Sequence, residues 1–169
     1  MLKVGDVLDF GPIQMKMTVR KFTPETLDIE MELDPRSGGT PLHTHPNAVE
    51  VYEVLEGQFD AFLNGEWKIF TQGQKVRIEK NTPHTFRNSS DSVTRVLNSH
   101  QPALKMAEYI EGLYKIAHSG VTNGKMNFPT MLYMSVLMSS FKAEVTPVNP
   151  PAPVTQVFGF IGKLAGYKI

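Results

Sequence analysis

The chain of 169 residues contains no cysteine. This excludes disulfides, zinc–thiolate sites, iron–sulfur clusters and thiol nucleophiles, although five histidines remain as possible metal ligands. The sequence also lacks an excess of charge of either sign, because 17 Lys and Arg balance 17 Asp and Glu. Proteins that bind nucleic acids usually carry a basic surface. We therefore expect no nucleic-acid partner.

Long apolar runs are missing as well. The longest stretch, residues 131–138, is far shorter than the roughly 20 residues of a membrane-spanning helix. The first ten residues include Asp6 and Asp9 and no apolar run, which is unlike a secretory signal. We expect no membrane partner, a cytoplasmic location, and one compact domain or one domain with an appendage.

The first hundred residues carry the patterns of short strands. Apolar and acidic residues alternate over 27–33, which is typical of a strand with one buried face. Asn64-Gly65 between apolar-rich flanks predicts a tight hairpin. Further short runs lie at 75–78, 84–88 and 93–97. Many short strands at this spacing predict a β-sandwich or barrel.

The pattern changes after Pro102, where apolar residues recur at threes and fours until Gly120 and predict a helix. A second apolar, methionine-rich helix is predicted from Pro129 towards Phe141. The proline-rich residues 145–154 predict an extended connector, followed by a last short helix with Thr155 as its N-cap. We thus predict a barrel over residues 1–101 and a helical extension over 102–169 that packs on it.

Histidines supply the strongest chemical signal. If residues 43–45 are extended, His43 and His45 project from the same face. Glu50, at the start of the next apolar run, can face back towards them, and His84 would complete a set of three nitrogens and one oxygen. This donor set suits Fe, Mn, Co, Ni, Cu or Zn better than Ca or Mg. The alternative is that the His-x-His pair is incidental.

The order of these residues resembles the cupin superfamily. The matching residues are Gly38 or Gly39, His43, His45, Glu50 and Gly57 in the first motif, and Gly73, His84 and Asn88 in the second. The resemblance implies a mainly β fold, the double-stranded β-helix or jelly-roll barrel. It also implies that His43, His45, Glu50 and His84 bind one divalent transition metal ion.

Other residues have competing interpretations. Tyr52 shares the parity of Glu50, and Phe86 and Asn88 share that of His84, so these three are candidates for substrate binding or, alternatively, core and turn residues. His100 and His118 lie outside both motifs, and we interpret them as exposed or capping histidines. The remaining candidates are Met126, Met131, Met134 and Met138, which predict helical core, with an apolar ligand tunnel as the alternative.

Cupin folds serve enzymes, regulators and storage proteins, so the fold does not define the function. We expect a metal-dependent enzyme, dioxygenase-like or isomerase-like, that acts on a small organic molecule. The alternative is a non-catalytic binding or sensing protein, although no helix-turn-helix is evident in the helical part. We also expect a homodimer, with an edge strand within residues 1–24, while a monomer with a covered edge is the alternative.

Overall fold

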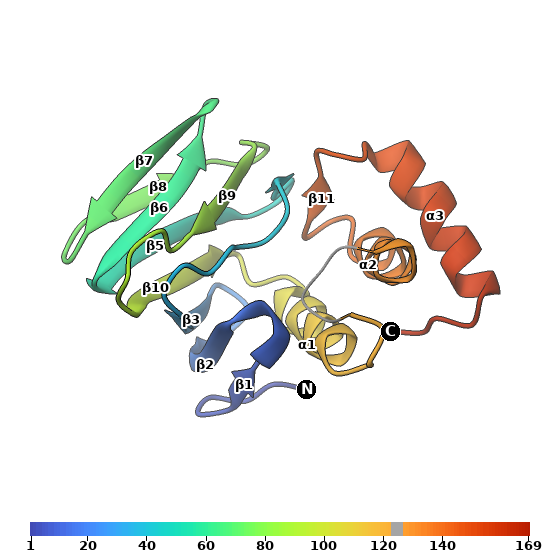
Figure 1. Cartoon of the computed structure of the whole chain (residues 1–169), viewed down its shortest axis with the longest axis horizontal. Coiled ribbons are helices and arrows are strands. Elements are labelled where there is room, and N and C mark those ends of the chain that lie inside the picture. The colour runs from blue at the N-terminus through green and yellow to red at the C-terminus, as the bar shows by residue number, and fades with distance from the viewer. Residues whose placement is uncertain (123–126) are drawn as a thin grey trace.

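The computed structural model describes residues 1–122 and 127–169, apart from the side chain of Pro12. Its strands form two antiparallel sheets, and the α-helices lie together at one side of them (Figure 1). The chain is thus mainly β, with a double-stranded β-helix and C-terminal helices, as the sequence predicted.

The larger sheet has six strands in the order β1-β2-β3-β10-β5-β8. They are β1 (Val7–Asp9), β2 (Met15–Phe22), β3 (Leu27–Leu33), β10 (Thr94–Gln101), β5 (Val49–Glu56) and β8 (Lys75–Ile78). Every second residue of β3 is buried, which confirms the strand predicted from the alternation over 27–33. One edge of this sheet is β1, which lies within the range 1–24 predicted for an edge strand, whereas β2, with its alternating Met15, Met17 and Val19, pairs on both sides.

The second sheet has five strands in the order β11-β4-β9-β6-β7. They are β11 (Thr146–Pro147), β4 (His43–Thr44), β9 (His84–Arg87), β6 (Gln58–Leu63) and β7 (Glu66–Thr71). Asn64 and Gly65 connect β6 to β7, both with positive φ, as a two-residue hairpin turn requires. The C-terminal part of the chain therefore donates a strand, β11, to the sheet that carries His43 and His84.

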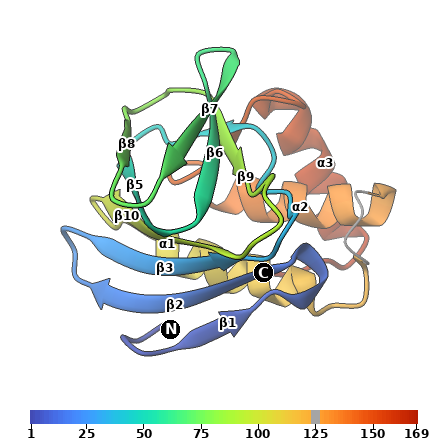
Figure 2. The same ribbon diagram turned by 60° about the vertical axis from the view of Figure 1, so that its left-hand side comes forward.

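A short 3-10 helix, η1 (Gly11–Ile13), joins β1 to β2, and three α-helices follow the strands in the described part of the chain. These helices are α1 (Met106–Ala117), α2 (Phe128–Ser140) and α3 (Ala152–Leu164). Helix α1 lies against the sheet that contains β2 and β3 (Figure 2). Ile110 and Ile116 of α1 belong to the same buried cluster as Met17 and Met31 of the barrel. The barrel and α1 thus share one hydrophobic core.

Helix α3 packs mainly on α2. Gly159 and Gly162 of α3 approach main-chain atoms of α2 so closely that a Cβ would lie 2.8 Å from the Ser135 oxygen or 2.9 Å from the Leu132 oxygen. Helix α3 begins at Ala152, so Thr155 is not its N-cap and the predicted connector is too long by three residues. Proline is tolerated in a first helical turn because those N–H groups have no partner within the helix.

No helix in the described residues is both long and apolar enough to cross a membrane.

Candidate metal centre

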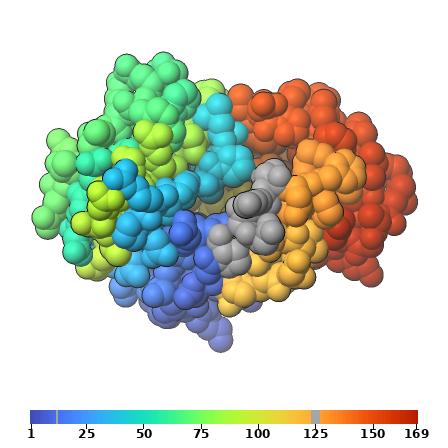
Figure 3. Space-filling model, viewed as in Figure 1, coloured from blue at the N-terminus to red at the C-terminus, as the bar shows by residue number. Residues whose placement is uncertain are grey.

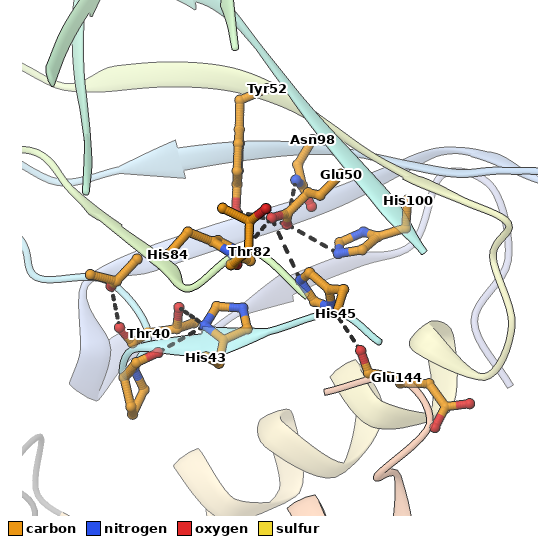
Figure 4. A network of polar contacts seen from close by, with 12 residues as sticks. Thr40, His43, His45, Glu50, Tyr52, Thr82, His84, Asn98, His100 and Glu144 are labelled. Atoms are coloured by element: carbon orange, nitrogen blue, oxygen red, sulfur yellow. Dashed lines mark hydrogen bonds and ion pairs between the residues drawn. The ribbon is translucent and has the colours of Figure 1, made fainter. Parts of the chain in front are cut away.

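Three short stretches of chain bring the predicted ligands together. His43 on β4 pairs directly with His84 on β9 in the smaller sheet. Glu50 comes from β5 in the larger sheet, and His45 lies just after β4. All four side chains are buried, with residue exposures from 1% for His84 to 6% for His43. The barrel therefore places the three imidazoles and the Glu50 carboxylate beside one another in a buried cluster, in which His43, His45 and His84 form one possible metal-binding group and His45, Glu50 and His100 a second (Figure 4).

Each of the three imidazoles is oriented by a main-chain carbonyl. Nδ1 of His43 lies 2.8 Å from the Pro41 oxygen, and Nδ1 of His84 lies 2.8 Å from the Thr82 oxygen. Nδ1 of His45 lies 2.7 Å from the Glu144 oxygen. A carbonyl can only accept, so Nδ1 carries the hydrogen in all three rings, and in the neutral form of each ring Nε2 keeps its lone pair. This is the tautomer that a metal ligand needs.

One carboxylate oxygen of Glu50 accepts hydrogen bonds, and the other has no hydrogen-bond partner. Its Oε1 accepts hydrogen bonds from the Tyr52 hydroxyl at 2.8 Å and from the Asn98 amide at 2.9 Å. Nε2 of His100 lies 3.1 Å from the same oxygen. Oε2 instead faces the histidines, 2.7 Å from Nε2 of His84 and 3.5 Å from Nε2 of His45. Oε2 is therefore the oxygen available to a ligand.

The polar atoms at the centre of the cluster have no hydrogen-bond partners. Glu50 Oε2, His84 Nε2 and His45 Nε2 are fully buried, and the short approach between Oε2 and His84 Nε2 lacks hydrogen-bond geometry. Buried polar groups without partners are rare because desolvation alone costs about 1–3 kcal/mol each. Lone pairs that converge on one place fit a bound cation, and nitrogen with carboxylate oxygen is a donor set of divalent transition metals. The residues present therefore fit the metal that the sequence implied.

The charges of the cluster are coupled. Burial lowers the pKa of His43 to about 3, and the neighbouring His84 and His45 add to this effect. Burial alone would raise the pKa of Glu50, but His45, His100 and His84 hold it well below the usual range. Burial opposes a charge on His45 too, yet Glu50 raises its pKa. In the metal-free protein, His43 is thus neutral and Glu50 is ionised at neutral pH.

The loop before β4 is fixed by a close approach of two main chains. A Cβ on Gly39 would lie 2.0 Å from the main-chain oxygen of Phe86, whereas a Cβ on Gly38 would meet nothing within 4 Å. The motif glycine that the sequence left open between these two positions is therefore sterically required only at Gly39. This contact fixes the path of the chain into β4 and therefore the position of His43, its first residue.

The three candidate substrate-binding residues have different positions. Tyr52 and Phe86 border a small cavity beside the histidines, and their rings pack on each other and on Phe59. Asn88 is buried elsewhere: its amide donates to the carbonyls of Leu33, Asp34 and Ser92, and its oxygen accepts from Ser90. Asn88 thus stabilises this loop, which is the turn-residue alternative that the sequence left open.

Sequence reasoning missed three polar residues of the site: His100, Glu144, and Asn98, whose amide donates to Glu50. His100 is 4% exposed and pairs across the sheet with Glu50, so its interpretation as an exposed or capping histidine was wrong. The signal was present, since Val96, Asn98 and His100 continue one alternating face of β10. Glu144 contributes through its main chain, which no side-chain pattern reveals. His118, in contrast, is exposed at the end of α1.

Comparisons with known proteins agree with this geometry. Residues 29–100 match the family described as Cupin domain. The regulator named HTH-type transcriptional regulator PuuR from Escherichia coli (strain K12) is 26% identical over 99 residues, which cover 57% of this chain and 54% of that protein. The PuuR protein of Shigella flexneri matches equally. This chain spans about half the length of these curated relatives.

Solved structures resemble the fold. KdgF from Halomonas sp. has a TM-score of 0.53 and 22% identity, covering 57% of this chain and 86% of that one. An RmlC-like cupin from Shewanella frigidimarina NCIMB 400 has a TM-score of 0.54 and 20% identity, covering 61% and 88%. The family match, the two sheets and the order of the motif residues agree, and residues 29–100 of this chain therefore belong to the cupin superfamily.

Proposed function

We propose that the protein binds one divalent transition metal ion through His43, His45, Glu50 and His84 and uses it to act on a small organic molecule. The observation that carries this proposal is the group of buried lone-pair atoms without hydrogen-bond partners at Glu50 Oε2, His45 Nε2 and His84 Nε2. A bound ion of this class would supply Lewis-acid chemistry or, if it is redox-active, electron transfer to the substrate.

The residues around the cluster have defined tasks in this proposal. The carbonyls of Pro41, Thr82 and Glu144 fix the histidine tautomers. Tyr52 and Asn98 hold the carboxylate of Glu50 in one orientation. The aromatic and apolar walls of the adjacent cavity exclude water and leave the polar contacts of a ligand to the cluster. These features support an enzyme of the dioxygenase-like or isomerase-like kind.

Metal analysis of protein purified without chelators tests the proposal. We expect close to one equivalent of Fe, Mn, Co, Ni, Cu or Zn per chain, and its loss in Glu50→Gln, which keeps the side-chain shape but removes the charge. Oxygen uptake with a panel of phenolic and diketone compounds then separates the two enzyme classes. Uptake with iron, copper or nickel supports a dioxygenase, whereas zinc or manganese without uptake favours an isomerase or a binder. Protein that retains no metal would contradict the metal centre.

A second candidate function is non-catalytic binding or sensing of a small molecule. The specific observation in its favour is the similarity to PuuR, which is named as a transcriptional regulator. A ligand that binds with metal-dependent affinity and is recovered unchanged after prolonged incubation would favour this alternative. Turnover of the same ligand would exclude it.

The remaining expectations from the sequence stay predictions: a homodimer, a cytoplasmic location and no nucleic-acid partner. In the described part of the chain, β1 lies at one end of the larger sheet, and its outer edge offers backbone N–H and C=O groups with which a strand of a second chain can pair. Light scattering measures the assembly directly. A mass near the 18.9 kDa of one chain contradicts the dimer, and about twice that mass supports it.

A further inference from the structure

Three cavities follow one another from the candidate metal centre into the helical layer. The first, about 40 Å³, borders His45, Glu50 and Tyr52. The second, about 360 Å³, lies between the loop over residues 38–41 and helices α1 and α2. The third, about 130 Å³, lies between α2 and the proline-rich segment before α3. From the first cavity to the third, the lining residues change from barrel strands to helices and the segment before α3.

Neighbouring cavities share walls. Thr40 and Leu113 border both the first and the second cavity, and Pro41 and Met134 border both the second and the third. In the space-filling view, the segment around residue 40 (blue-cyan) lies across from α1 and α2 (gold and orange) (Figure 3). The cavities are therefore adjacent.

Two elements run along the series. Helix α1 presents Ile110 to the first cavity, Leu113 to both and Ile116 to the second, which is one helical face at spacings of three. Strand β2 does the same with Met17 and Met15, two residues apart on one face. A ligand could therefore follow one continuous wall from the barrel into the helical layer.

The residues that line the cavities change from polar and charged to mainly apolar along this path. Glu50 and three histidines, His43, His45 and His100, border the first cavity. Among the described residues, no charged side chain borders the second or the third, where Met134, Met131 and Leu113 contribute apolar surface. The second cavity alone is in the size range of small-molecule sites. Methionine side chains adapt to ligands of irregular shape.

The net charge of the cluster indicates which chemical group of a ligand would bind there. Three neutral imidazoles and one carboxylate carry a charge of about −1, so a divalent ion would leave about +1 in a buried place. An anionic oxygen group would neutralise that charge.

We propose that the ligand is an elongated amphipathic acid, with a carboxylate-like head at the histidine–glutamate cluster and an apolar chain in the cavity between α1 and α2. This rests on the proposed metal centre. The helical extension then lines the apolar part of the ligand site. Of the methionines singled out in the sequence, Met134 borders this apolar site, whereas Met131 and the buried Met138 border only the third of these cavities. Met126 lies outside the described residues.

Calorimetric titration of zinc-loaded protein with straight-chain carboxylates, from acetate to dodecanoate, tests this assignment. We expect the dissociation constant to fall roughly fourfold per methylene over the chain lengths that the cavity holds. Met134→Trp should fill the second cavity and abolish the dependence on chain length, while the zinc content stays that of wild type. Val157→Trp places the same ring on the exposed side of α3 and should behave as wild type.

The outcomes separate the two proposals. A dissociation constant that does not change with chain length, or a dependence that persists in Met134→Trp, overturns the apolar site while zinc binding still supports the metal centre. If the protein retains no zinc, the metal centre fails, and the same titration on metal-free protein reports the cavity alone. Chain-length dependence that is lost in Met134→Trp then supports the apolar site, and its absence overturns that site as well. If Met134→Trp does not fold, Ala117→Leu, which narrows the same cavity from α1, takes its place.

Discussion

Nε2 of His100 lies 3.1 Å from Oε1 of Glu50, and the two residues are direct cross-strand neighbours on β10 and β5. His100 therefore acts on the oxygen of Glu50 that faces away from the other histidines. Its Nδ1 is buried without a hydrogen-bond partner. His100 therefore helps to orient the Glu50 carboxylate from the side opposite the other three histidines.

Replacing His100 by Leu should weaken metal binding without removing a ligand. Groups that orient metal ligands typically change affinity by about 10- to 100-fold when they are lost. Competition with a chromogenic chelator measures this change. His118→Leu, at an exposed position, is the matched control and should keep the wild-type affinity. Equal affinities of the two variants would show that His100 has no orienting role.

Replacing His45 by Ala should release the metal while the metal-free domain stays folded. The side chain is one polar contact within a packed barrel, and a single hydrogen bond such as the one to Glu144 contributes only about 0.5–1.5 kcal/mol. Metal content and thermal melts of chelator-treated wild type and variant test both parts. Global unfolding of His45→Ala at room temperature would contradict this expectation.

Acid should destabilise the metal-free protein before its carboxylates titrate. Burial lowers the pKa of His43 from 6.5 to about 3, and burial also lowers the pKa of His100. Below pH 6.5 the unfolded chain therefore binds protons that the folded chain does not, and the free energy of unfolding falls as the pH drops towards 3. Below pH 4.5 the lowered pKa of Glu50 adds to this loss. The raised pKa of His45 acts in the opposite direction, because its stabilisation is fully present only below 6.5.

His43 alone contributes at most about 1.4 kcal/mol per pH unit in this range. Urea unfolding of chelator-treated protein at several pH values between about 7.5 and about 4 measures the slope. His43→Gln should give a flatter dependence than wild type. The same slope in both proteins would show that His43 is not the group responsible.

Alanine at the two adjacent glycines should have opposite effects. Gly39→Ala forces a Cβ against the main chain at Phe86, and such overpacking typically costs about 1–3 kcal/mol. Gly38→Ala meets open space, so its effect should be near zero or stabilising by up to about 1 kcal/mol. Denaturant midpoints of both variants, with metal content as a second readout, test this contrast. Similar stabilities for the two variants would contradict the steric requirement at Gly39.

The elements with local signals were predicted well from the sequence. Alternation gave the strand over 27–33, and Asn64-Gly65 gave the hairpin because both residues tolerate positive φ. The start of α3 was misplaced because proline is unfavourable inside helices but neutral in a first turn, and the sequence does not show where that turn begins.

Only the part of the candidate site that follows a sequence motif was predicted. Its four proposed ligands follow a spaced motif, and the structure brings their side chains close together. His100 was missed because the polar residues Asn98 and Ser99 resemble the end of a strand, and the burial of Asn98 and His100 depends on partners in β3 and β5 that are distant in sequence. Asn88 matched the motif, yet its partners are loop carbonyls, so the match described the turn rather than the site.

The carbonyl of Glu144 that orients His45 belongs to the main chain, 99 residues away. Every amino acid offers the same carbonyl, so the contact that orients His45 does not depend on which residue type stands at position 144. Insertions or deletions between α2 and β11 would move that oxygen and would be selected against. Related chains should therefore preserve the length of this segment, a constraint that appears as the absence of gaps rather than as a conserved letter.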